Sequence, residues 1–210
     1  MSILQELSQL IFPSRCFGCS TLATSICANC SAEWKVRHYL TKLENLKVQS
    51  AVLYTPVAAK VILAAKESGI ASADELLIQV IIGVLEKVKL DTQPFRLVPI
   101  PSSRQSQRRR GRSFIVDLVQ EISDRTGIPT LNCLALANKV ADQSGLSRKQ
   151  RLENMKGAFC IKQVARGNLI LIDDVVTTGA TLKEAARALN SQGLRAHISA
   201  ITACVAQPLR

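Results

Sequence analysis

Leu169-Ile-Leu-Ile-Asp-Asp-Val-Val-Thr-Thr-Gly-Ala-Thr181 is the stretch of sequence that says most about the fold. Its first four residues are apolar, which predicts a buried strand, and the residues after it have helical spacing. Asp173 and Asp174 stand at the expected C-terminal end of this strand, where open α/β sheets bind their ligands. Between the carboxylates and the helix lies a turn of small and hydroxylated residues, which includes Thr177, Thr178, Gly179, Ala180 and Thr181.

This turn has the composition of an anion site. Small residues let backbone N–H groups turn inward, and the start of a helix adds positive potential. The hydroxyls of Thr177, Thr178 and Thr181 can donate to phosphate oxygens, whereas the two carboxylates would repel a phosphate. Asp173 and Asp174 therefore suit two ribose hydroxyls or a divalent cation, and we assign them as the candidate catalytic pair. The alternative is an acidic turn that only caps a helix; a Walker loop is excluded because its glycine spacing and lysine are missing.

The rest of the chain alternates strands with helices, which predicts a mostly parallel α/β sheet flanked by helices. Helices are expected over residues 2–12, 56–66, 72–89, 113–125 and 180–191. Strands are expected over residues 48–54, 95–100, 131–136, 158–161, 168–172 and 196–206. Ser72 and Glu75 have the spacing of a capping box, and the polar, basic residues 102–112 are expected to form a loop. We assign residues 48–210 to this α/β domain.

Four of the seven cysteines form two Cys-x-x-Cys pairs, Cys16 with Cys19 and Cys27 with Cys30. Paired knuckles of this kind converge on one point, and four thiolates complete the tetrahedral shell of a structural zinc ion. Gly18 is expected in the first knuckle because a positive φ is often required there. Redox-active or free thiols and an iron–sulfur site remain the alternatives. Residues 1–47 are assigned as a zinc finger and linker, and the three single cysteines as core residues, namely Cys133, Cys160 and Cys204.

The chain of 210 residues has a net charge of +11. Much of the excess lies in one segment that contains no acid, with arginines at 104, 108, 109, 110 and 112. Such a balance indicates a polyanionic partner, either nucleic acid or a phosphorylated small molecule, although a solvated basic surface would look the same. The start MSILQELSQLIFP lacks the basic region of a signal peptide, and no apolar run is long enough for a membrane span. A cytoplasmic location is expected, where clustered cysteines favour metal over disulfides.

Several motifs together resemble one family. IDDVVTTGAT at residues 172–181 is similar to the phosphoribosyl pyrophosphate signature of type I phosphoribosyltransferases. The cysteine pairs narrow the resemblance, as does VPIP at residues 98–101 followed by the arginine-rich segment that ends at Gly111. So does Gln143-Ser-Gly-Leu-Ser-Arg-x-x-Arg151-x-x-Asn154-x-x-Gly157-Ala-Phe159. In combination these motifs resemble the ComF family of competence-related proteins over nearly the whole chain.

The resemblance implies a zinc finger, a type I phosphoribosyltransferase fold and a role linked to DNA uptake or processing. The ligand would be phosphoribosyl pyrophosphate or ribose 5-phosphate, with Mg²⁺ on a diphosphate substrate, and the partners would include single-stranded DNA and competence or DNA-processing proteins. Ser102, Ser103 and Arg104 would form the pyrophosphate loop. Residues 143–157 would form a mobile flap, or else a basic surface helix. Where the family often has Arg-Gly-Phe-Asn-Gln, this chain has Arg110-Gly-Arg-Ser-Phe114, so contacts from the Asn and Gln are absent.

The resemblance does not establish catalysis, because the family's enzymatic activity is not generally established. One hypothesis is an enzyme that transfers a phosphoribosyl group and releases pyrophosphate. The alternative is a nucleic-acid-handling or regulatory protein that uses the fold without turnover. Two further expectations concern the acidic loop: its carboxylates should be needed for ligand binding but hardly for folding, and a side chain at Gly179 should block the phosphate.

Overall fold

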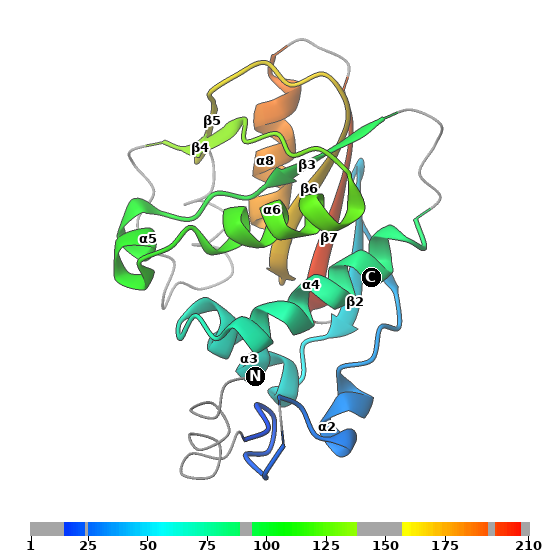
Figure 1. Cartoon of the computed structure of the whole chain (residues 1–210). Helices are drawn as coiled ribbons and strands as arrows, with labels where there is room; N and C mark the ends of the chain where they lie inside the picture. The colour runs from blue at the N-terminus through cyan, green and yellow to red at the C-terminus, as the bar shows by residue number, and fades with distance from the viewer. Residues whose placement is uncertain (1–14, 24, 89–93, 138–156, 193–195, 207–210) are drawn as a thin grey trace.

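A computed structural model describes residues 15–23, 25–88, 94–137, 157–192 and 196–206. Its centre is a five-stranded sheet in the order β1-β2-β7-β6-β3 (Figure 1). β1 is antiparallel to β2, and the other neighbouring pairs are parallel. The strands are β1 (Tyr39–Leu43), β2 (Leu46–Leu53), β3 (Phe95–Pro99), β6 (Gly167–Val176) and β7 (Ala196–Val205). The expected mostly parallel α/β sheet flanked by helices is confirmed.

Both faces of the sheet are covered, because the apolar residues of its strands alternate between two cores. Ile170 and Ile172 of β6 belong to the core that contains α3 (Pro56–Lys66), α4 (Ala71–Leu85) and α6 (Phe114–Thr126). Leu169 and Leu171 belong to the core on the opposite face, which contains α8 (Ala180–Asn190). Figure 1 shows α3, α4 and α6 on one side of the sheet and α8 on the other. A strand covered on both faces must be apolar throughout, which explains the unbroken run at residues 169–172.

The structure corrects four details of the predicted elements. Residues 104–110 are not loop but a short helix, α5 (Arg104–Arg110), because Ser103 caps it by accepting a hydrogen bond from Ser106 N and Gly111 ends it at φ 68°. α4 is capped by Ile70 without a side-chain hydrogen bond, so the capping box at Ser72 is wrong. Residues 39–43, expected as linker, form β1. β6 continues through both aspartates to Val176, because β7 pairs with it along that length.

A small second sheet covers one side of the α8 face. It consists of β4 (Leu134–Leu136) antiparallel to β5 (Phe159–Ile161), and its residues Leu134 and Phe159 are buried in the α8 core. Within the described residues no single helix is long and apolar enough to cross a membrane. α3 and α4 together meet the length and composition of a span, but the pair is bent by 119°. The predicted helix over residues 2–12 lies outside the described residues.

Within the described residues, the cysteine-rich segment shares the core of the α/β domain. Cys16, Cys30 and Trp34, which follows α2 (Ala28–Glu33), are buried in the same cluster as α3 and α4. Lys60 of α3 also donates a 2.6 Å hydrogen bond to the carbonyl of Gly18. The domain boundary at residue 47 remains a proposal. β1 and the start of β2 lie on the N-terminal side of this boundary, although both strands belong to the central sheet.

Candidate functional site

The two loops singled out in the sequence lie beside the same cavity. β3 and β6 are adjacent and parallel, and their pairing places Pro99 beside Ile172. The chain that leaves β3 and the aspartates of β6 therefore meet at the carboxyl edge of the sheet, where α/β folds bind ligands. A cavity of about 300 Å³ lies there. Its walls include Lys66, Ser102, Ser103, Arg110, Leu136, Phe159, Asp173, Asp174, Thr177 and Thr181.

The two aspartates have different surroundings. Asp174 is 8% exposed and accepts a 2.5 Å hydrogen bond from the ammonium of Lys66, in α3. Asp173 has no cation of its own among the described residues; its Oδ1 accepts a hydrogen bond from Asp174 N. Burial, together with the negative charge of Asp174, raises the pKa of Asp173 well above its usual range. Asp174 is therefore ion-paired with Lys66, whereas Asp173 lies in the cavity wall without an ion pair among the described residues.

Lys66 is a site residue that the sequence analysis missed. Burial alone would lower the pKa of its ammonium group, but the charges of Asp174 and Asp173 outweigh burial and the pKa is raised. Nothing in the apolar helix 56–66 marks this lysine as different from Lys60, because its partner is 108 residues away. The expectation that both carboxylates are dispensable for folding does not fit Asp174, since removing it would leave Lys66 unpaired in a partly buried place.

The turn before α8 consists of small and hydroxylated residues. Gly179 caps the helix at φ 74°, a left-handed conformation that glycine adopts without strain. Thr178 Oγ1 accepts a hydrogen bond from Ala180 N. Thr177 is exposed and lines the cavity together with Thr181. The first amides of α8 lack intrahelical partners, so this turn can present N–H groups and hydroxyls to an anion. A smaller hollow of about 50 Å³ runs from Asp173 to Leu182 along the same turn.

The expected need for glycine at position 179 has a physical reason other than the approach of a phosphate. A Cβ at this position would meet the side chain of Leu43, at the end of β1, rather than the cavity alone. Glycine is required by the packing of the hairpin formed by β1 and β2 as well as by the positive φ.

The predicted pyrophosphate loop is divided between two places. Ser102 and Ser103 line the cavity. Arg104 is exposed and lines a shallow groove on the outer side of α5, with Arg108 and Arg112. The arginine in the cavity wall is Arg110, whose side chain is 8% exposed. The seven-residue helix α5 causes this separation, because its first and last residues face different ways.

The arginine-rich segment is largely neutralised in the folded chain, although no acid occurs within it. Glu67 accepts hydrogen bonds from Arg109 and Arg110. Arg112 pairs with Asp74 and Asp117, and its guanidinium lies 5.3 Å from the centre of the Phe114 ring. Arg104 and Arg108 have no acidic partner among the described residues. The charge available to a polyanion on this segment is therefore much smaller than its sequence indicates.

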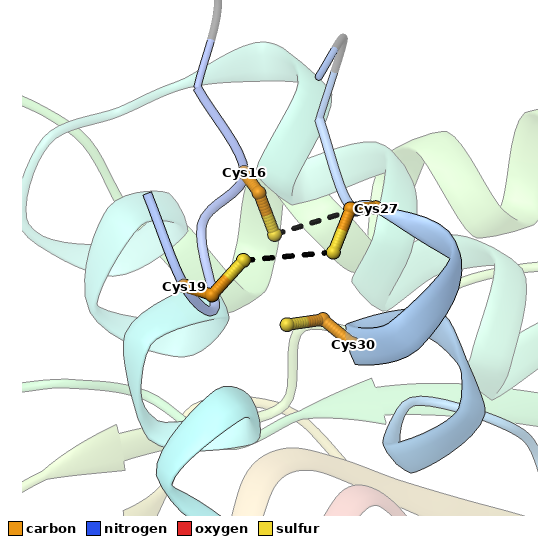
Figure 2. Close-up of side chains that lie close together, drawn as sticks. All are labelled: Cys16, Cys19, Cys27 and Cys30. Atoms are coloured by element: carbon orange, nitrogen blue, oxygen red, sulfur yellow. Dashed lines mark hydrogen bonds between the residues drawn. The ribbon is translucent and has the colours of Figure 1, made fainter. Parts of the chain in front are cut away.

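The four clustered cysteines fit a metal ion. Their Sγ atoms all lie within 4.8 Å of one another (Figure 2), and a tetrahedral zinc ion with bonds of about 2.3 Å would separate its sulfurs by about 3.8 Å. Cys27 N donates to Cys16 Sγ at 3.3 Å. Although burial opposes it, this and other backbone hydrogen bonds lower the pKa of Cys16 to about 6, whereas burial raises the pKa of Cys30 to about 12. A cluster of four converging sulfur atoms suits structural zinc.

Two details of this region differ from expectation. Gly18 does not have a positive φ; Ser20 does, at 64°. Glycine is nevertheless needed at position 18, because a Cβ there would lie 2.6 Å from Cys30 Sγ. Of the three single cysteines, Cys133 and Cys204 are buried as expected, but Cys160 is exposed on β5, where side chains alternate between the core and solvent.

The predicted flap is only partly described. Residues 143–156, with Arg148, Lys149, Arg151 and Lys156, lie outside the described residues. At the end of the motif, Gly157 N donates to the buried carboxylate of Glu184 in α8, and Phe159 lines the cavity.

Sequence comparison with known proteins finds partial similarity to competence proteins. Competence protein F of Haemophilus influenzae is 35% identical over 106 residues, which cover 48% of this chain and 46% of that protein. Over about half of its length, this chain is similar in sequence to competence protein F. Competence protein ComFC of Bacillus subtilis is 38% identical over 113 residues, covering 51% of this chain and 43% of that protein. DNA utilization protein YhgH of Escherichia coli is 32% identical over 110 residues, covering 49% and 46%. The matches span less than half the length of each relative.

Among solved structures, orotate phosphoribosyltransferase of Aeropyrum pernix is similar with a TM-score of 0.40 and 12% identity, covering 82% of this chain and 77% of that one. Adenine phosphoribosyltransferase of Leishmania tarentolae has a TM-score of 0.38 and 12% identity, covering 68% and 74%. No family model matches the chain.

Proposed function

We propose that this chain is a ComF-like protein whose α/β domain is of the phosphoribosyltransferase type and binds phosphoribosyl pyrophosphate or ribose 5-phosphate. The observation that carries the proposal is the meeting of Asp173 and Asp174 with Thr177 and Thr181 around one cavity at the carboxyl edge of the sheet. Carboxylates suit the ribose hydroxyls, and the donor-rich turn suits the phosphate. The names of the homologous competence proteins support a role linked to DNA uptake or processing.

Each part of the site has a role in binding. The turn from Thr177 to Thr181 would hold the 5-phosphate with amides and hydroxyls, and Asp173 would accept hydrogen bonds from the ribose. Ser102, Ser103 and Arg110 would face a pyrophosphate group, since Arg holds phosphate oxygens with a planar fork of donors. Carboxylate oxygens are ligands that Mg²⁺ takes together with substrate phosphates, and Asp173 offers one in the cavity wall. When bound there, Mg²⁺ would neutralise charge on a diphosphate leaving group.

Phosphoribosyl transfer itself is tested by experiment. Neither histidine of the chain, His38 nor His197, is among the described residues that line the cavity. The nucleic-acid alternative is supported by Arg104 and Arg108, which are exposed on one side of α5 one helical turn apart.

Calorimetric titration with ribose 5-phosphate tests the proposal, with ribose and inorganic phosphate as control ligands. We expect ribose 5-phosphate to bind at least about tenfold more tightly than either control, because it alone fills both halves of the site. Thr177→Val and Thr181→Val should weaken ribose 5-phosphate binding and leave the melting temperature within about 2 °C of wild type. Equal affinity for ribose 5-phosphate and inorganic phosphate would refute the site. A pyrophosphate-release assay with free bases then separates an enzyme from a binding protein.

A further inference from the structure

Lys66, the last residue of α3, and Glu67, which caps that helix, contact the two loops of the site, residues 173–181 at the end of β6 and residues 101–113 after β3. Lys66 donates to Asp174 on β6 at 2.5 Å. Glu67 accepts from Arg110 Nε at 3.0 Å and Nη2 at 2.7 Å, and from Arg109 Nη2 at 3.0 Å. The side chains of these two consecutive residues are thus ion-paired, that of Lys66 to β6 and that of Glu67 to the last turn of α5.

These contacts fall on groups that face the cavity. Lys66, Arg110 and Asp174 all line it. The side chains of Asp174 and Arg110 are 9% and 8% exposed, so neither has much freedom to move apart from its partner. Ion pairs of this kind, with short and charge-assisted hydrogen bonds, fix geometry better than exposed pairs do.

Few other hydrogen bonds among the described residues join the two loops. The amide of Ile100, directly after β3, donates to Ile172 O on β6. Beyond that point, among the described residues, no hydrogen bond joins residues 101–113 directly to residues 173–181. Among the described residues, the end of α3 is therefore the polar bridge between the loop after β3 and the loop at the end of β6.

We propose that Lys66 and Glu67 are positioning residues that set the separation of the two loops, and so favour a ligand that spans both loops over one that occupies a single loop. Of the two ligands considered above, phosphoribosyl pyrophosphate spans both loops and ribose 5-phosphate occupies the loop at the end of β6. This inference rests on the proposed function for its ligands. Holding both loops in place before binding reduces the ordering that a spanning ligand must impose, which raises its affinity selectively.

The test compares Glu67→Gln and Lys66→Met with two matched controls. Glu75→Gln removes a similar carboxylate that pairs with Arg125 between α4 and α6, away from the cavity. Lys162→Met removes an exposed lysine that donates to Asn132. Lys66→Arg keeps the charge next to Asp174 and serves as the conservative variant. Each protein is titrated calorimetrically with ribose 5-phosphate and with phosphoribosyl pyrophosphate, and its amide hydrogen exchange is measured without ligand.

For Glu67→Gln we expect the ratio of phosphoribosyl pyrophosphate affinity to ribose 5-phosphate affinity to fall about tenfold. Exchange of residues 101–111 should accelerate about tenfold, because the last turn of α5 loses its anchor. For Lys66→Met we expect both ligands to bind more weakly and exchange of residues 173–178 to accelerate, with Lys66→Arg close to wild type. Neither control should change the affinity ratio or the exchange of these segments.

An increased affinity of Glu67→Gln for phosphoribosyl pyrophosphate would overturn the proposal, since Glu67 would then be a competitor for Arg110 and not its anchor. Unchanged exchange in both segments would overturn it as well. If the wild type binds neither ligand, the proposed function fails, while the exchange of the two segments still decides whether Lys66 and Glu67 position the loops.

Discussion

Leu43, the last residue of β1, packs directly against Gly179, the residue that caps α8, so that a Cβ on Gly179 would overlap Leu43 Cδ1. The two residues are far apart in the sequence, and the contact joins the edge hairpin to the turn that precedes α8. Gly179 also has φ 74°. Two separate physical constraints, a steric one and a conformational one, therefore act on the same glycine.

Gly179→Ala should destabilise the fold by about 2–4 kcal/mol, through left-handed strain and overlap with Leu43. Leu43→Ala relieves only the overlap, so the double variant should be more stable than the sum of the single effects by about 1 kcal/mol or more. Gly127→Ala is the matched control, because Gly127 has φ 71° with no atom near its Cβ position and reports strain alone. Chemical denaturation of the wild type, the two single variants and the double variant gives the coupling energy, and a value near zero would show that Leu43 is not the obstacle.

Asp173→Asn should raise the melting temperature at neutral pH. The pKa of Asp173 is raised in the folded protein by burial and by Asp174. This carboxyl therefore contributes stability below its unfolded pKa of about 3.9, and the contribution is lost as the pH rises through the raised folded pKa. Thermal denaturation in steps from about pH 4 to about pH 8 should show the variant gaining on the wild type as the pH rises. Parallel curves would mean that Asp173 is ionised without cost.

Asp174→Asn should have the opposite effect on stability. It removes the partner of Lys66, whose side chain is 30% exposed, and leaves that ammonium without compensation. The expected loss is about 1–3 kcal/mol of unfolding free energy, less than for a fully buried pair because water reaches Lys66. The double variant Lys66→Met, Asp174→Asn should recover part of the loss, since no unpaired charge then remains. A single Asp174→Asn variant as stable as the wild type would show that the ion pair contributes nothing.

Gly18→Ala should weaken zinc binding, because the added methyl carbon would lie 2.6 Å from Cys30 Sγ and push this ligand away. Gly83→Ala in α4 is the control, since its Cβ would meet only Val36 at an ordinary 3.6 Å. Metal analysis should give about one zinc per wild-type chain, and competition with a chelator should strip Gly18→Ala first. Chelation should also lower the melting temperature, because Cys16 and Cys30 share the core of α3 and α4. Wild-type protein that carries no zinc and has disulfides by mass spectrometry would contradict the assignment.

Binding to single-stranded DNA should depend on Arg104 and Arg108 more than on Arg109 and Arg110. The first two have no acidic partner among the described residues, whereas the second two are paired with Glu67. Replacing Arg104 and Arg108 by Gln should reduce the slope of log K against log salt by about 1.4, which is about 0.7 for each phosphate that is no longer neutralised. The paired replacement of Arg109 and Arg110 should change this slope little. Equal slopes in both variants would mean that the outer side of α5 is not the surface that binds DNA.

The sequence by itself determined the fold class, the cysteine cluster and the succession of strand, turn and helix start over residues 169–181. These features are local: four apolar residues predict a buried strand, the spacing of Cys16, Cys19, Cys27 and Cys30 predicts one convergent site, and the small residues at 177–181 predict a turn that leads into a helix. Each depends on residues that are neighbours in the chain, so that pattern and chemistry can be read together.

Only the tertiary structure decided which charges are free and which are paired. Lys66 lies beside Asp174, and Glu67 beside Arg110, because the end of α3 reaches the carboxyl edge of the sheet in the folded chain. The sequence places these partners 108 and 43 residues apart, and nothing in their local patterns links them. Electrostatic interactions depend on distance in space and on burial, and both are fixed only when the sheet and its helices come together.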